Sequence, residues 1–252
     1  MPDQDSLEPY LFYGTVLPER APLSLKYKTP KRISVQTADG ESRSLNVHLN
    51  IILNQIGVTV EVEQEFERIF DLRNIVKDII QDDLALVGFI KGHAYNFEIT
   101  RVINRSFSTD FVFGIDIPVI AERNKDMSVQ GRFEEILRKA TTPDGIYLKR
   151  CFSDLVAAMK DHQNSSFYCY LAIESLRNHC AVANNMLISK EKAQWKKFRE
   201  VSGYCREDIE RYKPEYADQQ RHGKPGKPMS DQERAEMFLL TWDIVDAYLD
   251  SI

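Results

Sequence analysis

The residues most suited to chemistry lie close together at the end of a predicted helix. Arg221, His222 and Lys224 all fall within residues 217–224. A histidine titrates near neutral pH and can act as an acid or a base, while an arginine can hold a phosphate through its fork of N–H groups. We therefore regard His222 and Arg221 as candidate catalytic residues and Lys224 as a candidate binding residue. The helix dipole also favours cations here by about 0.3–1 kcal/mol, which explains the same charges without catalysis.

A second polar set lies on a helix predicted for residues 165–180. Tyr170, Glu174 and Arg177 are spaced i, i+4 and i+7, so they share one helix face, and Asn178 lies beside them. If this face turns toward another helix, these four residues can bind a ligand. If it faces solvent, it holds one helix ion pair worth roughly 0.3–0.5 kcal/mol. Both interpretations stay open.

The C-terminal half resembles HEPN-type helical domains from about Tyr147 to Ile252. Three stretches carry the resemblance, at residues 167–180, 207–223 and 233–249. The resemblance implies a bundle of four or five helices, of a kind found in toxins, antiphage systems and RNA-processing proteins. Many such domains are metal-independent ribonucleases in which two protomers bring their arginine–histidine motifs together. It therefore implies a homodimer formed through the helical half, with RNA or a nucleotide as a candidate ligand.

The chain departs from the HEPN ribonuclease motif at its central residues. In that motif a histidine follows an arginine by four to six residues, whereas Arg221 directly precedes His222. Arg211 lies too far upstream, and Arg177 is too close to His179. Whether the protein is an enzyme therefore stays open. If it is, the resemblance implies an endoribonuclease in which His222 is the acid–base group and Arg221 or Arg177 binds the scissile phosphate.

Composition limits the class of protein. The 252 residues are 43% hydrophobic and carry a net charge of −5, which suits a packed core and argues against a duplex binder held by overall charge. No apolar run reaches the roughly 18 residues expected of a membrane span. The first residues lack the basic and apolar segments of a signal peptide. We therefore expect a cytoplasmic protein that does not contact a membrane.

Cysteine and histidine spacing gives no sign of a bound group. No CxxC pair occurs among the four cysteines, the five histidines are scattered, and no Walker-type phosphate loop is present. We therefore expect no metal and no cofactor. Cys169 and Cys180 fall on the apolar face of the 165–180 helix, where we expect them to lie reduced in the core.

The elements that position these residues divide into two halves. In the first half, one helical pattern starts at Leu72 with Asp71 as its expected N-cap, and Asp39-Gly40 predicts a hairpin turn. This order predicts an α+β domain over residues 1–125, mainly an antiparallel sheet with one packed helix. We expect any protein partner to bind through this half. Strands are predicted at residues 9–16, 23–27, 32–37, 45–49, 58–62, 84–90, 95–99 and 111–117.

The second half is predicted to be all-helical. Residues 121–132 are polar and lack periodicity, so we expect a linker there. A helical bundle then fills residues 133–252. Pro214 predicts a break in one helix, and Ser230 with Glu233 predicts a capping box that opens the last helix. Helices are predicted at residues 133–140, 147–160, 165–180, 189–202, 206–221 and 233–249.

Two classes of function follow. The first is a bacterial-type regulatory or interaction protein with a HEPN-like bundle used for dimerisation or for ligand binding. The alternative is a metal-independent ribonuclease-type effector of a stress or defence system. A module that binds a nucleotide or another small molecule through the same polar cluster, without chemistry, is a third.

Overall fold

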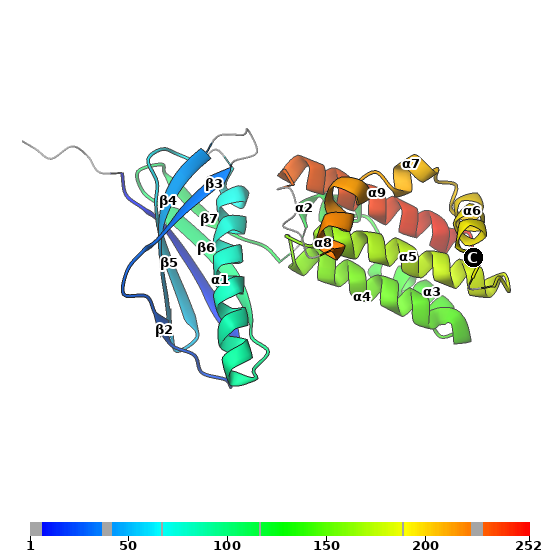
Figure 1. Cartoon of the computed structure of the whole chain (residues 1–252), viewed down its shortest axis with the longest axis horizontal. Helices are drawn as coiled ribbons and strands as arrows, with labels where there is room; N and C mark the ends of the chain where they lie inside the picture. The colour runs from blue at the N-terminus through cyan, green and yellow to red at the C-terminus, as the bar shows by residue number, and fades with distance from the viewer. Residues whose placement is uncertain (1–6, 37–41, 67, 116, 188, 223–228) are drawn as a thin grey trace, which may run out of the picture. The chain divides into compact units, whose positions relative to one another are not determined.

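Two compact units, residues 1–115 and 116–252, make up the chain. The computed structural model describes residues 7–36, 42–66, 68–115, 117–187, 189–222 and 229–252. Figure 1 shows a sheet with one long helix in the first unit and helices throughout the second. The predicted fold class is therefore confirmed: an antiparallel sheet with one packed helix, followed by a helical half.

The first unit is an antiparallel sheet with β1 at its centre. β1 pairs with β5 on one side and β6 on the other, and the strand order is β2-β4-β5-β1-β6-β7, with β3 also paired to β4. Phe12 of β1 therefore lies between Val58 and Val102. The strands are β1 (Tyr10–Leu17), β2 (Leu25–Lys26), β3 (Lys31–Gln36), β4 (Ser42–Ile52), β5 (Gln55–Glu61), β6 (Asn96–Asn104) and β7 (Thr109–Val112).

Helix α1 (Ile69–Lys91) covers one face of this sheet (Figure 1). Period-two alternation along the strands buries residues such as Phe12 and Val58, and these join Leu72, Val76 and Ile80 of α1 in one core. The apolar face of α1 and the inward-facing side chains of the strands thus pack together in one buried layer.

The strand predicted at residues 84–90 is wrong, because α1 continues to Lys91. Leu84 lies one turn beyond Ile80 and is buried in the same row. The helix continues through Gly88 and ends at Gly92, whose φ is 66°. A short apolar run cannot be assigned to a strand or a helix by its pattern alone.

Two smaller predictions for the first unit differ from the structure. Asp71 is not the N-cap, since α1 begins at Ile69 and Asp71 lies in its first turn, where the helix dipole favours a carboxylate. The last strand is β7 (Thr109–Val112), shorter than the predicted 111–117 at its C-terminal end. The Asp39-Gly40 hairpin turn lies outside the described residues.

The second unit is built around α5. This helix packs against α4, α6 and α9, and its Cys169 and Cys180 are buried as predicted. Cys151 is buried as well and Cys205 is exposed, and all four cysteines are free. The elements are α2 (Pro118–Arg123), α3 (Val129–Ala140), η1 (Pro143–Gly145), α4 (Ile146–Lys160), α5 (Ser165–Ala183), α6 (Glu191–Ser202), α7 (Arg206–Ile209), the π-helical turn η2 (Lys213–Ala217), α8 (Asp218–Arg221) and α9 (Asp231–Asp250).

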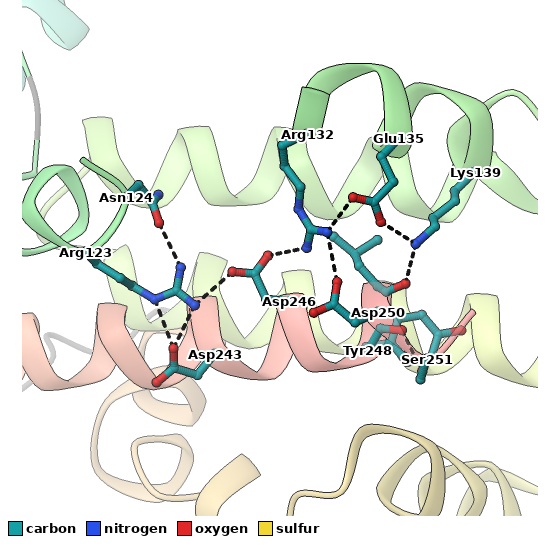
Figure 2. A network of polar contacts seen from close by, with 11 residues as sticks. Arg123, Asn124, Arg132, Glu135, Lys139, Asp243, Asp246, Tyr248, Asp250 and Ser251 are labelled. Carbon is teal, nitrogen blue, oxygen red and sulfur yellow. Dashed lines mark hydrogen bonds and ion pairs between the residues drawn. The ribbon is translucent and has the colours of Figure 1, made fainter. Parts of the chain in front are cut away.

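The linker predicted at residues 121–132 is wrong, because α2 and the start of α3 occupy it. Pro118 opens α2 at a position where its missing N–H costs nothing. Ser128 caps α3 by accepting a hydrogen bond from the Gly131 N–H. Two polar residues of this stretch, Arg123 and Arg132, are partly buried and paired with carboxylates of α9. Figure 2 shows Arg123 and Arg132 directed at the carboxylates of α9.

Two local predictions for the second unit are confirmed. The helix predicted at residues 206–221 is interrupted around Pro214, where α7, η2 and α8 replace a continuous helix. Ser230 and Glu233 form the predicted capping box at the start of α9, with both reciprocal hydrogen bonds present. In the described part of the chain, no helix combines the length and the apolar character needed to cross a membrane.

Candidate functional site

Two aromatic rings and two cations form a cluster on the polar face predicted for α5. The rings of Tyr170 and Trp195 stack with their centroids 6.2 Å apart. Arg177 Cζ lies 4.9 Å from the Trp195 ring centroid, and Lys213 Nζ lies 4.7 Å from the Tyr170 ring centroid. Each aromatic ring therefore has a cation over its face, where the π-electrons attract positive charge. We call these four residues the cation–aromatic cluster.

Three elements supply this cluster. On α5, Tyr170 and Arg177 lie two turns apart on one face. Trp195 projects from α6, one turn before the fully buried Phe198 that anchors that helix in the core. Lys213 comes from η2, the irregular turn that follows α7. The break at Pro214 thus places a lysine against α5 instead of continuing a helix past it.

Arg177 forms its ion pair with a carboxylate on the neighbouring helix α6 and not with one on its own helix. Its Nη1 donates to Glu191 Oε1 of α6 at 2.8 Å, and its Nη2 donates to Asn178 Oδ1 at 3.0 Å. Among the described residues, Glu174 makes no ion pair. The pair between Glu174 and Arg177 that a solvent-facing helix would hold is therefore not observed. The face of α5 turns toward α6, as the ligand-binding interpretation requires.

The protonation states of the cluster follow from its surroundings. Burial raises the pKa of Tyr170, the Glu174 carboxylate raises it further, and the Lys213 ammonium opposes both. For Lys213, burial alone would lower the pKa, but Tyr170, Asp218 and Glu210 outweigh it and the net shift is upward. At neutral pH the cluster therefore holds a neutral phenol beside a charged ammonium.

A hollow opens beside Tyr170, between α5, the α7–η2 segment and α9. It is shallow, and the space of about 300 Å³ between its walls includes open solvent. Its polar side includes Lys213, Tyr212 and Asp208, all of which are half-buried. Its apolar wall consists of Ile173, Ile209, Met237, Leu240 and Ile244. An apolar wall with a few polar groups at one side is the usual construction of a small-molecule site.

The charged side chains of this hollow differ in the partners they have. Asp208 already has donors, because the Cys205 thiol lies 2.9 Å from its Oδ2 and Arg211 Nη2 lies 3.4 Å from its Oδ1. Lys213 has only the distant Glu210 carboxylate, at 3.9 Å, as an ion-pair partner among the described residues. The hollow can therefore accept a negative group at Lys213. No set of three histidine, cysteine or acidic residues in the described ranges is arranged to hold a metal ion.

Arg221 and His222 lie elsewhere, at the end of α8. Both side chains are exposed, and neither forms an ion pair or hydrogen bond with a described residue. The preceding Gln220 anchors this end, since its Oε1 accepts from Ser166 Oγ at 2.9 Å and from the Phe167 N–H at 3.2 Å. The structure thus holds Arg221 and His222 near the start of α5 and does not join them to Arg177.

The predicted binding residues have a different outcome. Tyr170 and Arg177 contact α6, Asn178 accepts a hydrogen bond from Arg177, and the Glu174 carboxylate helps to raise the pKa of Tyr170. Lys224 is outside the described residues. Sequence reasoning did not assign Lys213 to this site. Its one signal was the adjacent Pro214, which broke the helical pattern there.

Comparison with known proteins identifies a family but no activity. The N-terminal domain of DUF8168, a domain of unknown function, matches residues 10–113, and the C-terminal domain of DUF8168 matches residues 133–252. A search of curated proteins and a search of solved structures each found no match. The two matched ranges correspond to the sheet unit and to the helices from α3 onward.

Proposed function

The chain belongs to the DUF8168 family, and we propose that it is a regulatory or interaction protein whose HEPN-like helical half binds a small ligand. The hollow beside Tyr170 carries this proposal, because it combines an apolar wall with a charged Lys213. Binding without chemistry accounts for the cluster better than catalysis does, since Arg221 and His222 lie outside it.

The hollow suits a small amphipathic anion. The hollow is shallow and partly open to solvent, so part of a bound ligand would stay exposed. The Lys213 ammonium would attract the anionic group, and side chains such as Ile209 and Ile244 would contact the apolar part. The Asp208 carboxylate, already hydrogen-bonded, would repel the ligand less than a free carboxylate.

Three probes of one chain length test this proposal by calorimetry on the full chain. Hexanoate carries the anion, hexanamide is its neutral counterpart, and hexylamine reverses the charge. We expect hexanoate to bind most tightly and hexylamine not to bind. Lys213→Met removes the charge but keeps the apolar stem, so hexanoate should then bind no better than hexanamide.

The matched control is Lys196→Met, at an exposed lysine on α6 that lies outside the hollow. This variant should bind hexanoate like the unchanged protein. Equal binding of all three probes, or equal loss of hexanoate binding in both variants, would remove the support for a site at Lys213.

The interaction part of the proposal concerns a protein partner of the N-terminal half. Near its C-terminal end, α1 exposes Leu86, Phe89 and Ile90, with exposed fractions of 60%, 84% and 70%. Contiguous apolar surface of this kind marks contact sites in many proteins. A photo-crosslinking residue at position 89 should capture a specific protein in cells. The same residue at the exposed Gln81 of α1 is the control and should not.

The second candidate function is RNA cleavage at Arg221 and His222. It is supported by the exposure of both side chains, which leaves them accessible to a large substrate. Incubation with a mixed RNA pool without added metal tests it, and His222→Ala should abolish cleavage. Cleavage that persists in this variant excludes His222 as the acid–base residue.

A further inference from the structure

Two opposite charges line the hollow beside Tyr170. The Asp208 carboxylate comes from α7 and the Lys213 ammonium from η2. Both side chains are partly buried, with exposed fractions of 31% and 25%. Among the described residues no ion pair joins the two, because Asp208 pairs with Arg211 and Lys213 with Glu210. Both charges can therefore contact the same ligand.

The Asp208 carboxylate can accept a further hydrogen bond. A carboxylate has two oxygens with about four lone-pair sites. Asp208 Oδ2 lies 2.9 Å from the Cys205 thiol, which is a weak donor, and Oδ1 lies 3.4 Å from Arg211 Nη2, which is long for a charge-assisted hydrogen bond. An ammonium group of a ligand can therefore donate to Asp208 without displacing a strong contact.

The other polar side chains of the hollow are uncharged. Thr241 donates to the Met237 carbonyl at 2.8 Å, and Ser166 donates to Gln220 Oε1 at 2.9 Å. Burial raises the pKa of both tyrosines, so their phenols are neutral at neutral pH. Burial also raises the pKa of the Cys169 thiol to about 12. Within the described ranges, the hollow thus presents one carboxylate, one ammonium and an apolar wall.

We propose that the ligand of this hollow is a free α-amino acid with an aliphatic side chain. Its carboxylate pairs with Lys213 and its ammonium donates to Asp208. An α-amino acid carries both charges and its side chain on or beside one carbon, so it can contact both protein charges and the apolar wall at once. This inference rests on the proposed ligand site and specifies the chemical class that the site binds.

The apolar wall selects the kind of side chain. Ile209 of α7 and Ile244 of α9 lie in this wall and are 5% and 0% exposed. A charged side chain placed against them would lose water without gaining a partner, whereas an aliphatic one would bury apolar surface. We therefore expect aliphatic amino acids to bind and glutamate to bind much more weakly.

Calorimetry of the full chain with hexanoate and the two enantiomers of norleucine tests the proposal. Norleucine is hexanoate with an α-ammonium group, so the comparison isolates the contact with Asp208. One enantiomer should bind at least about tenfold more tightly than hexanoate, because it adds a charge-assisted hydrogen bond. The other enantiomer should bind more weakly, since carboxylate, ammonium and side chain together fix the hand of the α-carbon. Glutamate of the preferred hand should bind at least about tenfold more weakly than norleucine.

The variant Asp208→Asn tests the residue that binds the ammonium. It keeps the size of the side chain but removes its charge, so norleucine should then bind no better than hexanoate. Hexanoate should bind at least as tightly as before, which also shows that the hollow is intact. The matched control is Glu207→Gln, at the preceding exposed carboxylate of α7, which lies outside the hollow. It should leave the binding of both probes unchanged.

The outcomes separate this inference from the proposed ligand site. If hexanoate binds and both enantiomers of norleucine bind no more tightly, the amino-acid ligand is overturned while the anion site stands. If none of the three binds, both are overturned. A preference for norleucine that persists in Asp208→Asn overturns the contact with Asp208. The comparison of enantiomers uses the unchanged chain, so it decides the ligand class whether or not the variant folds.

Discussion

Two histidine–tyrosine hydrogen bonds in this chain differ mainly in their surroundings. His179 Nδ1 lies 2.7 Å from the Tyr248 hydroxyl in the helical core, and His93 Nδ1 lies 3.1 Å from the Tyr95 hydroxyl at the surface. His179 is 6% exposed and Tyr248 is fully buried. A buried polar group cannot replace a lost partner with water, whereas an exposed one can. The two pairs therefore allow a matched comparison.

Removing the tyrosine hydroxyl should be costly only in the core. We expect Tyr248→Phe to lower the free energy of unfolding by about 1–3 kcal/mol, because it leaves the His179 ring nitrogen buried without that partner. Tyr95→Phe should change it by less than about 0.5 kcal/mol. Urea denaturation of both variants measures the difference. Equal effects would show that burial does not govern the cost.

The same histidine should make stability depend on pH. Burial lowers the pKa of His179, and the Asp144 carboxylate only partly opposes this. When the pH falls below about 6.5, the usual pKa of an unfolded histidine, the unfolded chain takes up a proton that the folded chain resists. This contribution to stability is therefore present above that pH and is lost as the pH falls toward the lowered pKa.

A variant without the imidazole of His179 isolates its contribution to the pH dependence of stability. Between about pH 7.5 and 5.5, the free energy of unfolding of the unchanged chain should fall more steeply than that of His179→Asn. Urea denaturation at several pH values gives both slopes. Identical slopes would mean that His179 titrates alike in the folded and unfolded chains.

At the scale of elements, one carboxylate of α9 holds two other helices. Asp246 accepts from Arg123 of α2 at 2.8 Å and from Arg132 of α3 at 2.7 Å. Its side chain is 24% exposed, whereas Asp250, which also pairs with Arg132, is 63% exposed. The position of Asp246 between two arginines is visible in Figure 2.

Loss of Asp246 should destabilise the helical unit more than loss of Asp250. Asp246→Ala leaves two partly buried guanidinium groups short of a carboxylate, and we expect a cost of about 1–3 kcal/mol. Asp250→Ala removes one exposed contact and should cost no more than about 1 kcal/mol. Thermal and urea unfolding of the two variants give the comparison. A larger effect at Asp250 would contradict this role of Asp246.

These elements also show what the sequence could and could not predict. The Ser230 capping box and the break at Pro214 depend on neighbouring residues, so local pattern predicts both. The strand predicted at residues 84–90 failed because burial, not local pattern, decides the state of a short apolar run. The linker predicted at 121–132 failed because its arginines are paired with α9, more than a hundred residues away in the sequence.

The candidate site likewise contains residues that the sequence could predict and residues that it could not. Helical spacing places Tyr170, Glu174 and Arg177 on one face without any knowledge of the fold. Trp195 and Lys213 reach that face only because α6 and η2 pack beside α5. Sequence could therefore predict the half of the cluster that lies on one helix. The other half, and with it the hollow, depends on tertiary contacts.

At the scale of the whole molecule, each unit has its own hydrophobic core. One core joins the sheet to α1, with Phe12 and Leu72 among its fully buried members. Two others lie within the helical unit, one around Leu176 and Tyr248 and one around Phe238. Among the residues that the structure describes, none belongs to the cores of both units. Each unit is also longer than the roughly 60 residues at which single domains commonly fold alone.

We therefore expect residues 1–115 and residues 116–252 to fold as separate fragments. The first should give a circular dichroism spectrum dominated by its sheet and one helix, and the second a helical spectrum. Leu72→Ala should destabilise the first fragment by about 2–5 kcal/mol. Tyr248→Phe should cost the second fragment the same free energy as the full chain, because its contacts lie within residues 116–252. A fragment that unfolds without a cooperative transition, or a different cost in fragment and full chain, would show that the cores depend on one another.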